Sequence, residues 1–172
     1  NADTGATLRS AFKALRMWGA PPEWLWKYDT KGFRDEPPMK AWAAGQGFQS
    51  VEYYSIRPDI AEIRRFMLET QNCPVGGMAV YEKSFQNASR NGVLTMPDKR
   101  DRMIGGHAVA VIGFDDSSGM LRIRNSHGEQ FGDGGDFLMP YDYLPQTTDW
   151  CGLVDSEYVN LTEKGYEATE TQ

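Results

Sequence analysis

Two short stretches decide how this chain folds: GGHAVAVIGF at 105–114 and RNSHG at 124–128. The first is an apolar run with His107 near its start, and its two glycines allow a tight backbone turn that leaves the imidazole accessible. Turn residues at 115–119 separate it from a second apolar run, so the two runs are predicted to form a β-hairpin. Asn125 follows that second run directly, and antiparallel pairing brings it close to His107.

A histidine beside an amide suggests acyl-transfer chemistry. The chain has two histidines, His107 and His127, and imidazole is the side chain that exchanges protons near neutral pH. An imidazole whose ring is oriented by an amide or a carboxylate is what nucleophilic acyl transfer requires. The alternative for His107 is structural: a histidine at a strand end that is hydrogen-bonded to a neighbouring loop.

The rest of the chain predicts an α+β fold, with helices first and antiparallel strands after them. Loop residues fill 21–38, where buried aromatic side chains are expected, and the polar segment 162–172 is expected to form a C-terminal tail. The predicted helices span 6–18, 39–44 and 58–69, and the predicted strands span 51–56, 75–81, 107–114, 120–124 and 137–140.

Length and composition indicate one compact domain, because 172 residues of which 40% are hydrophobic can bury a sizeable core. The net charge of −6 argues against a nucleic-acid-binding protein. No apolar run reaches the ~18 residues of a membrane span. Phosphate-loop, calcium-loop and zinc patterns are missing, so we expect neither a cofactor nor a metal.

The order of the motifs resembles papain-like cysteine peptidases of the C1 type, over residues from about Gly5 to Val159. The His and Asn blocks carry the resemblance, together with FGDGG at 131–135. PYDY at 140–143 is similar to the bacterial branch in particular. Weaker upstream matches are GAPPE at 19–23, WKYD at 26–29, Pro74-Val75, Tyr81, Ser84-Phe85 and Gly92-Val93.

The resemblance implies a papain-like α+β fold, in which a helical part precedes an antiparallel, barrel-like sheet. It makes His107 the general base and acid, and Asn125 the residue that orients its ring. Met78 resembles a residue that lines the substrate pocket, although a core methionine is an equal alternative. Gly106 and Ala108 flank the histidine and are expected to contact substrate.

Two residues near the site depart from the family pattern. His127 stands where the family has a tryptophan that shields the His–Asn contact from water, so we expect this contact to be more solvated here. Phe131 stands where a second tryptophan is common, which is a milder change.

The nucleophile is the larger departure. Cys73 and Cys151 both lack the family's nucleophile context, and each is expected to be a structural thiol. Since the family's cysteine precedes its histidine by about 130–150 residues, the spacing puts the nucleophile roughly 25 to 45 residues before Asn1. On this hypothesis residues 1–161 form a partial peptidase domain, which acts on polypeptides with a companion segment that carries the cysteine and the central helix.

Two other functions remain open at this point. The first is a peptidase-like binding or structural subunit without catalysis. The second is a different cysteine-dependent acyl transferase with the same fold.

Overall fold

The computed structural model describes residues 5–49 and 52–153 of the chain. They form two compact units, the first reaching to Tyr53 and including Leu153, the second spanning Tyr54–Gly152. The predicted tail at 162–172 lies outside the described residues, as does Val51 at the start of a predicted strand. Within the described part of the chain, every helix is too short or too polar to cross a bilayer.

The first unit is helical. Helix α1 spans Leu8–Trp18, where Thr7 caps its first turn by accepting a hydrogen bond from the Ser10 amide at 3.1 Å. Gly19 ends α1 with a positive φ of 71°, and a Cβ there would overlap the backbone carbonyl of Gly45. This glycine therefore lets the end of α1 approach the end of the second helix closely. That helix, α2, spans Met39–Gly45, and short 3₁₀ turns occupy Thr30–Gly32 and Gln46–Phe48.

The aromatic side chains of the loop at 21–38 are not buried, contrary to the prediction. Trp24, Tyr28 and Phe33 are 58%, 83% and 54% exposed. Local hydrogen bonds shape this loop instead: the Glu23 carboxylate accepts from the Tyr28 amide at 2.7 Å, and Asp29 accepts from the Lys31 amide at 2.8 Å. Polar turn contacts, and not aromatic packing, therefore determine the course of the loop.

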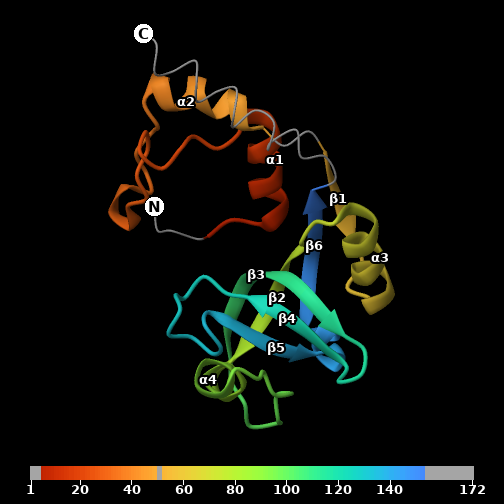
Figure 1. The fold of residues 1–172 in the computed structure, drawn as a ribbon. Helices are drawn as coiled ribbons and strands as arrows, with labels where there is room; N and C mark the ends of the chain where they lie inside the picture. The colour runs from red at the N-terminus through yellow and green to blue at the C-terminus, as the bar shows by residue number, and fades with distance from the viewer. Residues whose placement is uncertain (1–4, 50–51, 154–172) are drawn as a thin grey trace. The chain divides into compact units, whose positions relative to one another are not determined.

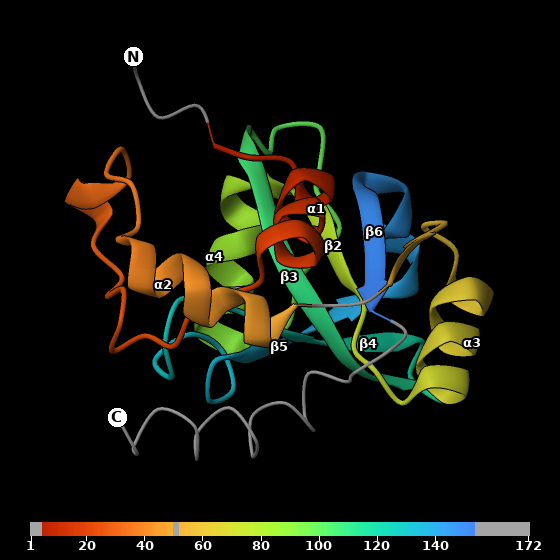
Figure 2. The same ribbon diagram turned by 90° about the horizontal axis from the view of Figure 1, so that it is seen from above.

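The second unit is built on a six-stranded sheet with the order β1-β6-β2-β3-β4-β5. The pairings of β2 with β6 and β3, of β3 with β4, and of β4 with β5 are antiparallel. Helices α3 and α4 lie apart from each other in both views (Figures 1 and 2), and buried residues of both helices join those of the strands in one hydrophobic core. The elements are β1 Tyr53–Ile56, α3 Ile60–Thr70, β2 Val75–Tyr81, α4 Glu82–Asn91, β3 Met103–Asp115, β4 Met120–Arg124, β5 Asp136–Pro140, a 3₁₀ helix Tyr141–Gln146 and β6 Thr147–Leu153.

Most of the predicted elements are present, and the hairpin of 105–124 is confirmed. The strands at 75–81 and 120–124 match the prediction, whereas β3 begins four residues earlier, at Met103. Helix α4 was not predicted, because its sequence EKSFQNASRN is mostly polar and its N-cap residue, Tyr81, makes no side-chain capping bond. Strand β6 was not among the strands predicted from the apolar pattern, although the segment around Cys151 is similar to a C-terminal strand segment of the family.

The core lies on one face of the sheet and follows the two-residue period of the strands. Val109 and Val111 of β3 are buried, as are Leu121 and Ile123 of β4, while the residues between them are more exposed. Trp150 on β6 is fully buried and lies against Gly76, where any side chain would overlap the indole ring. The absence of a side chain at Gly76 on β2 therefore makes room in the core for Trp150 on the neighbouring strand β6.

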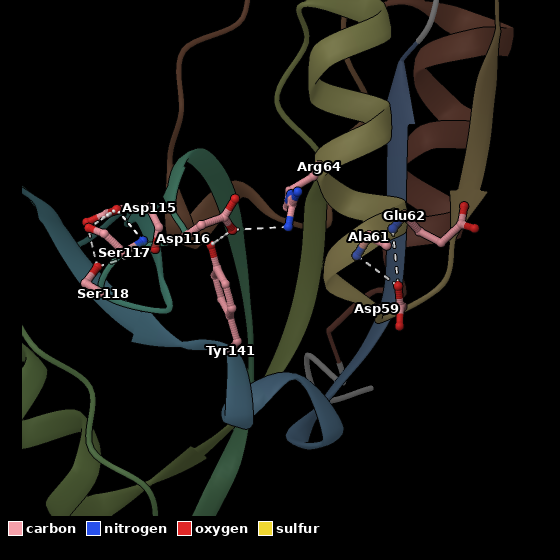
Figure 3. A network of polar contacts seen from close by, with 9 residues as sticks. All are labelled: Asp59, Ala61, Glu62, Arg64, Asp115, Asp116, Ser117, Ser118 and Tyr141. Carbon is pink, nitrogen blue, oxygen red and sulfur yellow. Dashed lines mark hydrogen bonds and ion pairs between the residues drawn. The ribbon is translucent and has the colours of Figure 1, made fainter.

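Helix α3 is attached to the rest of the second unit by a polar network (Figure 3). Asp59 caps the helix by accepting from the amides of Ala61 and Glu62 at 2.9 and 3.3 Å. Arg64 reaches Asp116 in the β3–β4 turn at 3.1 Å, and the Tyr141 hydroxyl donates to the same carboxylate at 2.9 Å. The hairpin turn is thus connected both to a helix and to the segment after β5.

The same turn is stabilised internally. The Asp115 carboxylate accepts hydrogen bonds from the hydroxyls of Ser117 and Ser118, each at 2.7 Å. These bonds lower the pKa of Asp115 to about 2. The carboxylate therefore remains charged across the neutral and mildly acidic range, as its role in the turn requires.

Replacing Gly76 by alanine tests the contact with Trp150. The new Cβ would overlap the buried indole, so we expect the free energy of unfolding to fall by about 1–3 kcal/mol, as in other overpacked cores. Urea denaturation measures this. The matched control is Gly113→Ala on β3, where the nearest atom to a new Cβ is 3.7 Å away; an equal loss in both variants would contradict the packing argument.

Candidate active site

The β3–β4 hairpin brings His107 and Asn125 together. Ala110 pairs with Arg124 in the register of the two strands. His107 lies three residues before Ala110 on β3, and Asn125 directly follows Arg124. The Nε2 atom of His107 lies 2.7 Å from Oδ1 of Asn125. The contact predicted from the spacing is therefore present, between two half-buried residues.

The orientation of the Asn125 side-chain amide follows from a neighbouring backbone N–H, which can only donate a hydrogen bond. The backbone amide of Ser126 donates to Asn125 Oδ1 at 2.8 Å. Turning the side-chain amide over would place its NH₂ group against this N–H, so two donors would face each other and the hydrogen bond would be lost. Since Oδ1 faces His107, the ring must carry its proton on Nε2, which leaves the lone pair of Nδ1 available as a base in the neutral form.

The Asn125 amide nitrogen is buried and has no hydrogen-bond partner within the part of the chain that the structure describes. An unsatisfied buried donor is unfavourable. The amide keeps this orientation because its oxygen accepts from several donors at once. The hydrogen bonds to the oxygen thus determine how Asn125 is held.

Aromatic rings surround the pair. Phe85 of α4 lies at the centre of the cluster, with its ring centroid 5.8 Å from that of His107, 5.7 Å from His127 and 5.0 Å from Phe131. The two imidazoles are 4.9 Å apart and nearly perpendicular. Phe137 is 5.8 Å from Phe131 and buries the base of the cluster. His127 itself is exposed, whereas His107 and Asn125 are half-buried, and the greater solvation of their contact stays a prediction.

Asp101 holds the helix that carries Phe85. Its carboxylate accepts from the backbone amides of Lys83 and Ser84 at 2.9 and 3.0 Å, and from the Ser84 hydroxyl at 2.7 Å. It therefore caps α4 from a distant part of the chain, in place of a local capping residue. Burial acts to raise the pKa of Asp101, but these hydrogen bonds outweigh it and the pKa is lowered.

An ion-pair cluster supports Asn125 from the other side. Asp136 is 3% exposed and stands opposite Arg124 in the β4–β5 pairing. Arg124 bonds both of its oxygens, at 2.5 and 3.1 Å, and Arg122 adds a third bond at 3.0 Å. These bonds lower the pKa of Asp136 against the opposing effect of burial, and the hydrogen bonding by Arg124 has the largest effect. These bonds therefore fix the end of β4, which Asn125 directly follows.

The three residues predicted to contact substrate differ in burial and do not lie on one face of the sheet. Met78 pairs with His107 in the β2–β3 register but is 1% exposed and belongs to the core, so the core interpretation is the one that its burial favours. Gly106 and Ala108 are exposed, and the alternation of β3 directs them to the face opposite His107. Their contact with substrate stays a prediction.

Neither cysteine is close to His107. Cys73 is exposed and precedes Met78, the register partner of His107, by five residues, or roughly 16 Å of extended chain. Cys151 is buried on β6 opposite Val75, three residues from Met78. Within the described residues no cluster of three or more histidine, cysteine or acidic side chains is arranged to hold a metal ion.

The sequence interpretation gave no role in the site to three supporting residues: Phe85, which was quoted only as a match to the family, Asp101 and Asp136. Phe85 had a signal, since Ser84, Phe85 and Ala88 lie three and four residues apart and this spacing is typical of a helix face. Asp101 and Asp136 had no local signal in the sequence, because their hydrogen-bond partners are far away in the sequence or on a neighbouring strand.

Acid should remove the contribution of Asp136. Because its pKa in the folded state is lowered, its stabilising effect is complete above the unfolded value of about 3.9 and is lost as the pH falls through the folded value. We expect Asp136→Asn to lower the free energy of unfolding by about 1–3 kcal/mol at pH 7, and the difference from wild type to shrink below pH 4. Urea denaturation at several pH values measures both.

The control for this prediction is Asp133→Asn. Asp133 pairs with Arg122 at 3.2 Å but its side chain is 76% exposed. Exposed ion pairs contribute only about 0–1 kcal/mol. A gap between wild type and Asp136→Asn that stays constant down to pH 2 would contradict the role of the charge.

Comparisons with known proteins find relatives of this chain and structures that share its fold. An uncharacterized peptidase C1-like protein of Acanthamoeba polyphaga mimivirus is 32% identical over 151 residues, which cover 83% of this chain and 48% of the relative. Xylellain, a cysteine protease from Xylella fastidiosa, superposes with a TM-score of 0.80 at 30% identity, over 89% of this chain and 63% of its own. No model of a known protein family matches the chain.

More distant structures share the fold. A cysteine protease of Carica candamarcensis, solved in complex with E-64, has a TM-score of 0.59 at 17% identity, over 86% of this chain and 67% of its own. The chain thus spans about half the length of the curated relative that it matches and under two thirds of xylellain. The motifs, the six-stranded fold and these likenesses together support a C1-type papain-like family.

Proposed function

We propose that this chain supplies the general base and the orienting amide of a papain-like cysteine peptidase. A segment outside these 172 residues supplies the nucleophilic cysteine. The observation that carries the proposal is the 2.7 Å contact between His107 Nε2 and Asn125 Oδ1. This contact leaves Nδ1 as the free nitrogen of the ring, and it occurs within a fold that cysteine proteases share.

In this mechanism His107 takes the thiol proton on Nδ1, and the resulting thiolate attacks the carbonyl carbon of a peptide bond. The tetrahedral intermediate collapses, the C–N bond breaks, and the imidazolium returns its proton to the leaving amine. Water then attacks the acyl-enzyme with His107 as the base, which releases the acid and regenerates the thiol. Asn125 Oδ1 accepts a hydrogen bond from Nε2–H throughout, and this bond holds the ring and favours its charged form.

The substrate class that follows is a polypeptide. Gly106 and Ala108 flank His107 on β3 and are exposed on the face of the strand opposite the ring. The polypeptide assignment therefore rests on the His107–Asn125 pair and on the shared protease fold, and not on these two residues. The side-chain preference of the substrate depends on residues outside this hairpin.

A second candidate function is that of a binding or structural subunit without catalysis. The observation that favours it is the position of the two cysteines, neither of which lies within reach of His107. In that case the family fold would present the hairpin to a peptide without cleaving it.

Labelling of the active-site thiol separates the two functions. The protein expressed from its complete gene is treated with a biotinylated epoxide that alkylates thiolates, and the modified peptide is identified by mass spectrometry. We expect one labelled cysteine outside the present 172 residues, with hydrolysis of a peptide substrate lost in parallel. His107→Ala should slow labelling by about 10²–10⁴-fold, since the thiol then lacks its base.

The matched control is Cys73→Ser, which removes the exposed cysteine of this chain and should leave labelling unchanged. Labelling of Cys73 itself, or equal rates in wild type and His107→Ala, would contradict the assignment of His107 as the base. Binding of a peptide with neither labelling nor hydrolysis would establish the non-catalytic function.

A further inference from the structure

A third donor points at the oxygen that orients His107. Nδ1 of His127 lies 2.9 Å from Oδ1 of Asn125, the same atom that His107 approaches at 2.7 Å. The backbone amide of Ser126 fixes this atom as the carbonyl oxygen. His127 must therefore donate, so its Nδ1 carries a proton in both the neutral and the charged form of the ring.

The three donors differ in where they come from. His107 reaches the oxygen from β3, whereas Ser126 and His127 belong to the same turn as Asn125. The two local donors hold the amide whether or not His107 is present in its reactive orientation. An oxygen that is already oriented needs no rearrangement when the ring becomes charged, which is how preorganised dipoles assist catalysis.

The ring of His127 is held in place by packing. Its centroid lies 5.5 Å from that of Phe131 and 5.7 Å from that of Phe85, and it meets His107 nearly edge-on. The ring therefore has two separate features: an aromatic body that packs against phenylalanines, and an N–H that reaches Asn125. The two can be removed independently by substitution.

We propose that His127 is a positioning residue, which donates from Nδ1 to Asn125 and so keeps the amide oxygen directed at Nε2 of His107. This inference rests on the proposed peptidase function for its effect on rate. Its structural content, that His127 holds the amide, stands without that function. In the place of the shielding side chain that the family has here, this chain has a hydrogen-bond donor.

Two substitutions separate the hydrogen bond from the packing. His127→Phe keeps an aromatic ring against Phe85 and Phe131 but has no donor. His127→Asn has a side-chain amide whose nitrogen is as many bonds from the backbone as Nδ1 of histidine, so it restores a donor without the ring. Glu129→Gln, in the same loop, is the matched control for a change of charge alone.

Rates of epoxide labelling are measured for each variant expressed from the complete gene, with equal unfolding midpoints as the check on folding. We expect His127→Phe to label about five- to tenfold more slowly, the size of effect that one hydrogen bond gives. His127→Asn should recover to within about twofold of wild type, and Glu129→Gln should match it. Equal rates in wild type and His127→Phe, or an Asn variant as slow as the Phe variant, would overturn the proposal.

A spectroscopic measurement decides the same question without activity. In protein with ¹⁵N-labelled histidine, the Nε2–H signal of His107 reports its hydrogen bond to Asn125. We expect this signal to shift or broaden in His127→Phe and to return in His127→Asn; an unchanged signal in His127→Phe would overturn the proposal. If wild type fails to label at all, the peptidase function fails, and the histidine signal alone still tests the role of His127.

Discussion

The side-chain oxygen of Asn125 accepts hydrogen bonds from two imidazoles and one backbone amide, and the candidate site is organised around this atom. Because the Ser126 amide can only donate, the oxygen is identified without reference to hydrogen positions. The proton on Nε2 of His107 and the free lone pair on Nδ1 then follow. The chemistry available to His107 is thus a consequence of how one amide is held.

Two groups of contacts hold the surroundings of this amide, and they work by different physics. On one side Asp136 is buried between two arginines, which fixes the end of β4 by charge. On the other side Asp101 caps α4 and so places Phe85 against both imidazoles, which fixes the rings by packing. A substitution in either group alters the site without touching His107.

The hairpin and the His–Asn contact were predictable, because both depend on short-range patterns: two apolar runs, a DDSSG turn and an asparagine directly after the second run. Helix α4 was not predicted, since its cap comes from Asp101 and its sequence is mostly polar, with Ser84 and Ala88 as its buried residues. The exposure of Trp24 and Tyr28 escaped prediction for the opposite reason: aromatic composition indicates burial, but local hydrogen bonds shape that loop. The burial of Met78 depends on which face of β2 meets the core, and a strand pattern with two glycines does not settle that.

The strand order has a consequence for folding. His107 and Asn125 meet across one hairpin, so forming their contact closes only a short loop, and contacts of this kind form early and at a small entropic cost. At the β1 edge of the sheet, β6 must return from Thr147 to reach β2, and this closure spans a far longer stretch of chain. Since β2 lies between that edge and the hairpin, the edge can open locally while the base and its amide stay paired. The low entropic cost of closing this loop and the geometry of the candidate site thus depend on the same interval, the eighteen residues from His107 to Asn125.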